Sequence, residues 1–259
     1  VLSFLLVLAF FATIQASTIY VKHDAAGSNN GSSWANAYND LQSALAAATN
    51  GDQIWVARGT YKPTPFNSRA ITFTMKTGVS LYGGFAGSES AITERDIVSN
   101  ETILSGDINT IGVNTDNTTS VVVFYNNNSV TLDGFSVTGG YSDGGSAGGW
   151  NSNGGGIIIG DFCSSLTINN VTVKSNYAQN NGSAIFIFSS GAVFTNCLII
   201  ENTGAAAVSV YGTNPVKSST FNNCTFANNA GPAVASIGYG TSISLNNCIA
   251  NDEGVSLAT

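Results

Sequence analysis

The chain has 259 residues, of which 43% are apolar and 9% are charged, so it can bury a continuous hydrophobic core. Its formal net charge is −7 and its eight basic residues are scattered, which argues against nucleic acid and anionic membranes as partners. Twenty-nine glycines and four prolines, with abundant Asn, Thr and Ser, are typical of many short strands joined by tight turns.

An apolar run occupies residues 1–16 (VLSFLLVLAFFATIQA) and ends in a small residue. We interpret it as the hydrophobic part of a secretory signal peptide that is cleaved after Ala16. A membrane anchor is the alternative, although the run is shorter than the roughly 20 residues that a spanning helix needs. Once the signal is removed, we expect no transmembrane span and a protein that is secreted or located on the outer cell surface.

Residues 17–50 are predicted to form a short strand at 19–22 and a helix from about 40 to 48. Asn39 and Gln42 have the spacing of a capping box, and Leu41, Ala44 and Leu45 lie on one apolar stripe. A helix ahead of the first coil of a solenoid can cover the open end, whose strands would otherwise be free to pair. We therefore predict an N-terminal strand and capping helix.

Residues 51–259 carry a repeated phrase, written INNVTV at 168–173, FTNCLI at 194–199, FNNCTF at 221–226 and LNNCIA at 245–250. Its corner Asn advances by 26, 27 and 24 residues, and such fixed-period similarity indicates stacked structural repeats. Apolar residues alternate on both sides of that Asn, as in two strands joined by a sharp corner. We predict an all-β, right-handed parallel β-helix with three strands per coil and about eight coils, truncated at its C-terminal end because residues 255–259 stop within a strand.

The corner residue of each coil needs a backbone conformation near positive φ, which Gly adopts freely and Asn tolerates better than other residues. Gly occupies the equivalent position in earlier coils, and Arg58 is an exception. Asn side chains stacked about 4.8 Å apart can also hydrogen-bond along the helix axis. The predicted structural corner ladder consists of Gly83, Gly106, Gly134, Asn170, Asn196, Asn223 and Asn247.

Three of the four cysteines, Cys197, Cys224 and Cys248, directly follow a corner Asn and are predicted to point inward. Neighbouring coils bring their Cα atoms within disulfide range, but parallel side chains make bridging awkward. We favour buried free thiols over disulfides. No His or carboxylate shares the column, so we predict no metal site and no cofactor.

A glycine-rich insertion at 139–156 (GGYSDGGSAGGWNSNGGG) separates two coils. Loops on a rigid scaffold often carry function, and an exposed Trp beside polar groups can stack on a sugar ring. The candidate ligand-binding residues are Tyr141, Asp143 and Trp150. The alternative is that Trp150 folds back and anchors the loop.

Two further sets of motifs carry a family resemblance. GGI at 155–157, SAI at 183–185 and PAV at 232–234, together with FANN at 226–229, resemble the GGA[ILV] and FxxN elements of chlamydial-type polymorphic outer-membrane-protein repeats, although the GGA elements are weak. The N-terminal stretch from IYVKHDAAG through GVSLYGGFAG and ERD resembles secreted right-handed parallel β-helix proteins of Bacteroidota-type bacteria. This resemblance implies a fold and a surface location but no defined reaction.

Many parallel β-helices cleave acidic glycans, and such enzymes need a basic residue for proton abstraction or paired carboxylates at a defined separation. The strands predicted at 156–160, 184–188, 207–211 and 233–237 contain no acidic or basic residue. Ionic candidates occur only in the early coils (Arg58, Asp107 and Asp133), where they do not cluster in sequence. The outward positions of the later strands are instead Ile158, Phe186, Phe188, Ser209 and Tyr211.

We therefore predict a non-catalytic secreted or cell-surface module for adhesion or glycan binding, which acts as a monomer on a polysaccharide or a host or cell-surface glycan. The alternative is a polysaccharide lyase or glycoside hydrolase that acts on acidic polysaccharide. Ice binding through the Thr rows is disfavoured, because these rows also contain Leu198 and Ile249.

Overall fold

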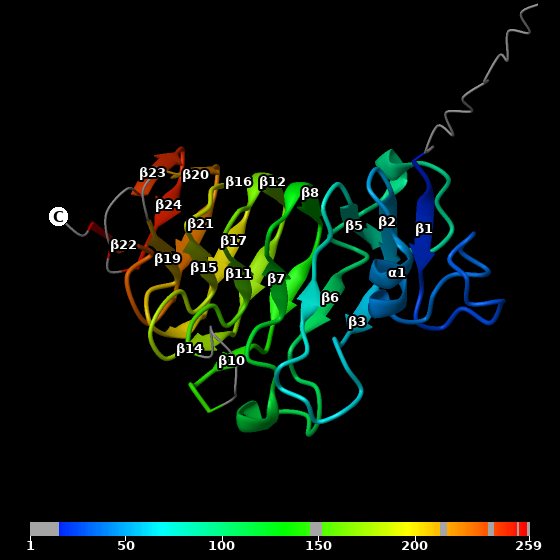
Figure 1. Cartoon of the computed structure of the whole chain (residues 1–259), viewed down its shortest axis with the longest axis horizontal. Helices are drawn as coiled ribbons and strands as arrows, with labels where there is room; N and C mark the ends of the chain where they lie inside the picture. Colours follow the sequence, from blue (N-terminus) through cyan, green and yellow to red (C-terminus); the bar gives the residue numbers. More distant parts are fainter. Residues whose placement is uncertain (1–15, 146–151, 213–216, 238–240, 253, 258–259) are drawn as a thin grey trace, which may run out of the picture.

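The computed structural model describes residues 16–145, 152–212, 217–237, 241–252 and 254–257, and the first 15 residues of the predicted signal peptide lie outside these ranges. The described chain is mostly β, and its strand pairings are parallel. Successive strands lie side by side from the N-terminal to the C-terminal end of the molecule (Figure 1). The predicted all-β parallel β-helix is confirmed.

Three long sheets and one short sheet form the sides of the β-helix, and the chain visits sheets A, B and C in turn, with the short sheet D between B and C in the middle coils. Sheet A contains β1 (Thr18–Val21), β2 (Gln53–Ala57), β5 (Ser80–Phe85), β8 (Asn128–Asp133), β12 (Ser164–Asn169), β16 (Ala192–Thr195), β20 (Lys217–Asn222) and β23 (Thr241–Asn246). Sheet B contains β3 (Gly59–Tyr61), β6 (Thr102–Ser105), β9 (Ser136–Thr138), β13 (Thr172–Lys174), β17 (Leu198–Ile200), β21 (Thr225–Ala227) and β24 (Ile249–Ala250). Sheet C contains β4 (Phe73–Thr74), β7 (Val122–Phe124), β11 (Ile157–Ile159), β15 (Ile185–Phe188), β19 (Val208–Tyr211), β22 (Val234–Ile237) and β25 (Val255–Leu257). Sheet D contains β10 (Tyr141–Ser142), β14 (Tyr177–Ala178) and β18 (Thr203–Gly204).

The core consists of files of apolar side chains that stack from coil to coil. Leu132, Ile168, Phe194 and Phe221 pair in register along sheet A, and all four are fully buried. The rings of Phe194 and Phe221 stack with centroids 4.4 Å apart and planes 4° from parallel. Because parallel register places equivalent residues of the repeat on top of each other, the alternating pattern of each coil builds a continuous interior.

Helix α1 (Leu41–Ala47) packs its buried face against β1, β2 and β4 at the N-terminal end of the β-helix, as Figure 1 shows. The residue that caps it is Asp40, whose side chain accepts a hydrogen bond from the Ser43 N–H, so the predicted Asn39 cap is wrong. The Asn39 amide instead donates to backbone carbonyls in the preceding loop, including that of Ala25 at 2.8 Å. Within the described residues, no helix is long and apolar enough to cross a membrane.

The corner between sheets A and B holds one file of left-handed residues. Gly134, Asn170, Asn196, Asn223 and Asn247 have φ values of 81°, 50°, 55°, 53° and 53°, and they follow strand positions that pair with one another. Their backbone N–H groups donate across coils, for example from Asn170 to the Thr195 carbonyl. The Asn side chains line the outer edge of this corner.

Two predicted ladder positions depart from this file. Gly83 directly follows Tyr82, which pairs with Asp133, so it occupies the corner position of its coil. The residue with a positive φ in this coil is instead Gly84, at 89°, close to the register shift between β2 and β5. The placement of Gly106 in the ladder is wrong, because Ser105 pairs with Thr138 and Gly106 therefore lies at the far end of sheet B. Residues 102–105 are the second strand of their coil rather than the first, although their sequence resembles the repeated phrase.

A second asparagine file lies at the far end of sheet B and is buried. The Asn176 Nδ2 donates to Asn202 Oδ1 at 3.1 Å, Asn202 Nδ2 donates to Asn229 Oδ1 at 2.9 Å, and Asn229 Nδ2 donates to Asp252 Oδ2 at 2.6 Å. Asn176 and Asn202 are 1% and 0% exposed. The file therefore satisfies polar groups inside the turns that follow β13, β17 and β21 and links consecutive coils.

Several outward positions of sheet C are covered. Ile158, Phe186 and Ser209 alternate with the core residues of their strands but are only 2%, 3% and 1% exposed, so these outward positions are covered rather than open to solvent. The connections between sheets D and C fold over this face, where the Gly182 N–H donates to Ser209 Oγ at 2.8 Å. Tyr211 remains partly exposed, at 36%.

Candidate functional site

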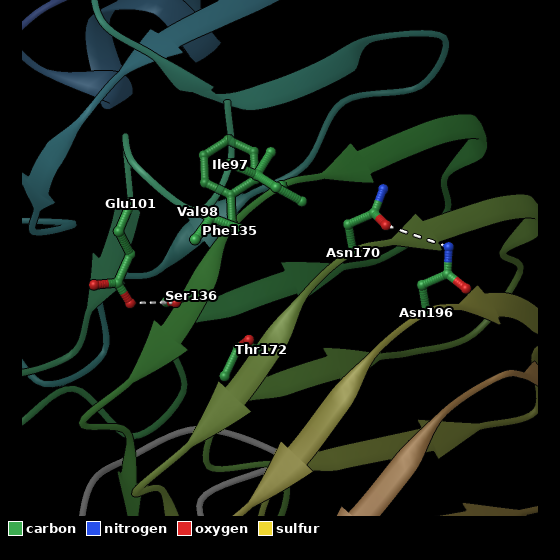
Figure 2. A pocket seen from close by; sticks show the side chains of 9 residues that line it. Ile97, Val98, Glu101, Phe135, Ser136, Asn170, Thr172 and Asn196 are labelled. Carbon is green, nitrogen blue, oxygen red and sulfur yellow. Dashed lines mark hydrogen bonds between the residues drawn. The ribbon is translucent and has the colours of Figure 1, made fainter. Parts of the chain in front are cut away.

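A pocket of about 330 Å³ lies on the outside of the corner between sheets A and B (Figure 2). Its floor is the outer surface of β9 and β13 with the corner residues before them, and its wall is the segment 97–101 from an earlier coil. The lining residues are Ile97, Val98, Glu101, Gly134, Phe135, Ser136, Asn170, Thr172 and Asn196.

The wall approaches the floor closely because one corner residue is glycine. A Cβ atom on Gly134 would lie 2.8 Å from Ile97 Cγ2 and 3.1 Å from the Gly83 carbonyl oxygen. The later corners carry Asn, whereas this corner must leave room for the segment that contains Ile97. The glycine therefore lets Ile97 pack directly against this corner.

Glu101 supplies the carboxylate of the pocket. Its Oε1 accepts hydrogen bonds from Ser136 Oγ at 2.7 Å and from Lys174 Nζ at 3.3 Å (Figure 2 shows the bond to Ser136). The bond from Ser136 lowers the pKa of Glu101, partial burial opposes this, and Lys174 lowers it further. The carboxylate is therefore ionised at neutral pH and accepts hydrogen bonds rather than releasing a proton.

Amide groups of the corner file form the opposite side of the pocket. Asn196 Nδ2 donates to Asn170 Oδ1 at 3.4 Å, as drawn in Figure 2, and Asn170 Nδ2 donates to Asp133 Oδ1 at 2.9 Å. Arg95 holds Asp133 in turn through an ion pair of 2.8 Å, with both side chains at most 15% exposed. This chain of contacts fixes the direction in which the amides face.

The pocket therefore combines amide and hydroxyl groups and one ionised carboxylate with an apolar wall, of which Val98 is 86% exposed. Such groups can donate and accept hydrogen bonds in several directions at once. Over the described part of the chain, no group of three or more His, Cys, Asp or Glu side chains is arranged to hold a metal ion.

The predicted ligand-binding residues lie elsewhere. Tyr141 forms part of β10 and stacks on Tyr177, and it lines a second pocket. Asp143 is paired with Arg69 through two hydrogen bonds of 2.9 and 3.3 Å. Burial acts to raise the pKa of Asp143, but the bonds from Arg69 lower it overall. Trp150 lies outside the described residues.

The early ionic candidates are not brought together around a common point. Asp133 is engaged by Arg95, Arg58 is exposed, and Asp107 accepts a hydrogen bond from the Gly112 N–H in its own loop. The residues that sequence reasoning missed are Glu101 and Lys174, which are 73 positions apart. The one visible signal is at Lys174, the only charged residue between Asp161 and Glu201, whereas Glu101 lies among other charged residues.

The cysteine column behaves as structural packing. Cys197 and Cys224 are 2% and 1% exposed, and all four cysteines are free thiols. The hydrogen bond with Cys224 and burial together raise the pKa of Cys197. The inward orientation predicted for this column is confirmed.

No protein-family model matches the chain, and no curated protein matches it in sequence. Its fold is similar to the pectin methylesterase from Aspergillus niger, at 14% identity and a TM-score of 0.52, over 93% of this chain and 80% of that enzyme. It is also similar to the pectin methylesterase PemA from Erwinia chrysanthemi, at 12% identity and a TM-score of 0.50, over 92% of this chain. A pectin methylesterase in complex with a hexasaccharide matches at 13% identity and a TM-score of 0.50 over 91% of this chain. The chain spans 66% of the length of each of the last two structures, and at these identities the likeness shows the parallel β-helix fold alone.

Proposed function

We propose that this protein is a non-catalytic β-helix module that binds neutral polysaccharide at the pocket beside the corner asparagines. The observation that carries the proposal is the state of Glu101, which Ser136 and Lys174 hold ionised among amide and hydroxyl groups. Sugar hydroxyls donate to such a carboxylate and to amide oxygens, and they accept from amide N–H groups. The apolar wall at Ile97 and Val98 suits the C–H face of a sugar ring.

The charge of the molecule favours a neutral glycan over an acidic one. The chain carries a net charge of −7, and the two cations beside the pocket, Lys174 and Arg95, are already paired with Glu101 and Asp133. A polyuronate would meet the Glu101 carboxylate without a free cation among the described lining residues. Like charges of this kind weaken association.

The same residues argue against cleavage. Glycoside hydrolysis uses two carboxyl groups, one of which must be protonated to act as an acid. Glu101 is the one carboxylate among the described lining residues, and its lowered pKa keeps it ionised. A lyase needs a base placed to take a proton from the sugar, and Lys174 is engaged in an ion pair.

The place of action that we propose is outside the cell, and the protein would act there as a monomer in adhesion or in glycan capture. The apolar sequence at 1–16, which resembles a secretory signal, supports this location. The resemblance to surface β-helix proteins supports it as well. The second candidate is an enzyme of pectin metabolism, favoured by the fold shared with pectin methylesterases.

Binding can be tested by calorimetry with cellohexaose, xylohexaose, mannohexaose and methyl-esterified hexagalacturonate, alongside unesterified polygalacturonate. Thr172→Phe fills the floor of the pocket, and Thr225→Phe is its matched control, since Thr225 lies on the same face of sheet B beyond the pocket. We expect at least one neutral oligosaccharide to bind the wild type. Thr172→Phe should weaken that binding about tenfold or more, and Thr225→Phe should leave it unchanged.

Catalysis is tested on the same substrates by measuring unsaturated uronate products, new reducing ends and methanol release. We expect none of the three. If the wild type forms a product and Glu101→Gln does not, the protein is an enzyme rather than a binding module. If Thr172→Phe and Thr225→Phe bind the oligosaccharide with equal affinity, this pocket is not the binding site.

A further inference from the structure

A second pocket, of about 240 Å³, lies at the other end of strands β9, β13 and β17 from the first one. It forms where these strands turn into the short sheet D, whose strands β10 and β14 are labelled in the lower left part of the molecule in Figure 1. The strand β13 between the pockets has three residues, which span roughly 10 Å at about 3.3 Å per residue. Both pockets thus border the same outer face of sheet B.

Two stacked tyrosines form one side of the second pocket. The rings of Tyr141 and Tyr177 have centroids 4.6 Å apart and planes 24° from parallel, and the Arg69 guanidinium lies 6.0 Å from the Tyr141 ring centre. The next residue in this file is the exposed Thr203, which pairs with Tyr177. Tyr177 is therefore the last aromatic ring of its stack, followed by a short side chain.

A glycine, Gly204, packs closely against the residues Tyr177 and Ala178 of the preceding coil. Gly204 has a φ of 100°, and a Cβ atom there would lie 2.1 Å from the Ala178 carbonyl oxygen and 3.0 Å from the Tyr177 ring. A larger residue does not fit at this position. Since consecutive coils are about 4.8 Å apart, a planar ring that stacked on Tyr177 would lie level with Thr203.

Two hydrogen-bond acceptors line the same pocket. Asn117 is 3% exposed, and its Oδ1 has no hydrogen-bond partner among the described residues, which is costly for a buried acceptor. Glu201 is exposed and occupies the left-handed corner after β17, with a φ of 58°, where the neighbouring coils carry Ser175 and Asn228 at 54° and 59°. Both side-chain oxygens can accept hydrogen bonds from a ligand in this pocket.

We infer that this pocket is a subsite for a neutral sugar ring, which stacks on Tyr177 and donates hydroxyl hydrogen bonds to Glu201 and Asn117. The inference rests on the proposed function and deepens it, because the two pockets then hold one polysaccharide chain across the outer face of sheet B. The Glu201 carboxylate disfavours a uronate at this subsite. Sugars that are too short to reach both pockets bind only weakly.

The test compares the neutral hexasaccharides named above with the corresponding disaccharides, by calorimetry on the full chain. Tyr177→Leu removes the stacking face, and Tyr177→Phe keeps it. Glu201→Gly removes the carboxylate and also relieves the left-handed backbone. Its matched control is Asn228→Gly, at the same corner of the next coil, where φ is 59° and the residue does not line the pocket.

We expect the wild type to bind its hexasaccharide at least tenfold more tightly than the disaccharide. Tyr177→Leu should lose most of this difference and Tyr177→Phe should keep it. Glu201→Gly should bind the hexasaccharide several-fold more weakly while its melting temperature stays equal or rises, whereas Asn228→Gly should bind as the wild type does. This last comparison separates binding from stability.

Two outcomes overturn the inference, and they are distinct. If the wild type binds a hexasaccharide and both Tyr177→Leu and Glu201→Gly bind it equally well, the second subsite is wrong and the first pocket alone binds the glycan. If the wild type binds none of the glycans, the proposed function fails and the subsite fails with it.

Discussion

Replacing Asn202 with Leu tests the buried asparagine file most directly. The Oδ1 of Asn202 accepts hydrogen bonds from the backbone and the side-chain nitrogens of Asn176, at 3.1 Å each. Its Nδ2 donates to the carbonyl oxygens of Val173 and Ile200 and to Asn229 Oδ1, all at 2.9 Å. Leu has the same branching and number of side-chain heavy atoms as Asn, and Asn202 is not left-handed, so the substitution removes the bonds without straining the corner.

The expected loss follows from the groups left behind. Each buried polar group that loses its partner costs about 1–3 kcal/mol, and several groups lose a partner here. Because neighbouring effects are not additive, we expect the free energy of unfolding to fall by about 3–5 kcal/mol. Against a total stability of about 5–15 kcal/mol for a typical domain, this is a large change.

The assay is urea denaturation followed by far-ultraviolet circular dichroism, with the m value compared between variants. Asn246→Leu is the control, since Asn246 is exposed, is not left-handed and makes one side-chain hydrogen bond, of 2.9 Å to Asn222. Its loss should stay below about 1 kcal/mol. Equal losses for Asn202→Leu and Asn246→Leu would refute the reasoning that burial makes this file important.

Two further perturbations test the corner and the N-terminal end. Asn223→Val places a β-branched residue at a φ of 53° and should lower the free energy of unfolding in urea by about 1–3 kcal/mol, whereas Asn223→Gly should be nearly neutral. Equal stability of the two variants would contradict the strained corner. Burial acts to raise the pKa of Asp52, but hydrogen bonds from Thr49 and Ser17 lower it to about 2. Its ionised form therefore contributes about 2 kcal/mol of stability that is complete above about pH 5 and is lost as the pH falls through 4 toward 2. Asp52→Asn should be less stable at neutral pH and should lose less stability over this acid range, and an unchanged pH profile would count against this role.

Local chemistry explains why the repeat was predictable. The alternation of apolar residues identifies strands that have an inner and an outer face, and the preference for positive φ identifies Gly and Asn as corner residues. Both signals lie within a few residues of each other. Gly134, Asn170, Asn196, Asn223 and Asn247 accordingly lie in one left-handed file.

Local similarity also misled at two places. The phrase around Gly106 resembles a corner, but its strand pairs within sheet B, and only the partner in the next coil reveals which side of the coil it occupies. Asn39 and Asp40 are both good helix caps, and Asn39 is drawn away by the loop carbonyls that its amide contacts. Competing partners distant in sequence decided both cases.

The repeat pattern was enough to predict the parallel β-helix, the five corner residues from Gly134 to Asn247 and the inward cysteines, because equivalent residues come into register once the coils stack. The tertiary structure alone decided where the surface is concave. Glu101 meets Lys174 across 73 positions, Arg69 meets Asp143 across 74, and Tyr177 ends a stack whose next position is Thr203. Such contacts depend on how long connections fold back over the coils, and the spacing of residues within one coil carries no information about that.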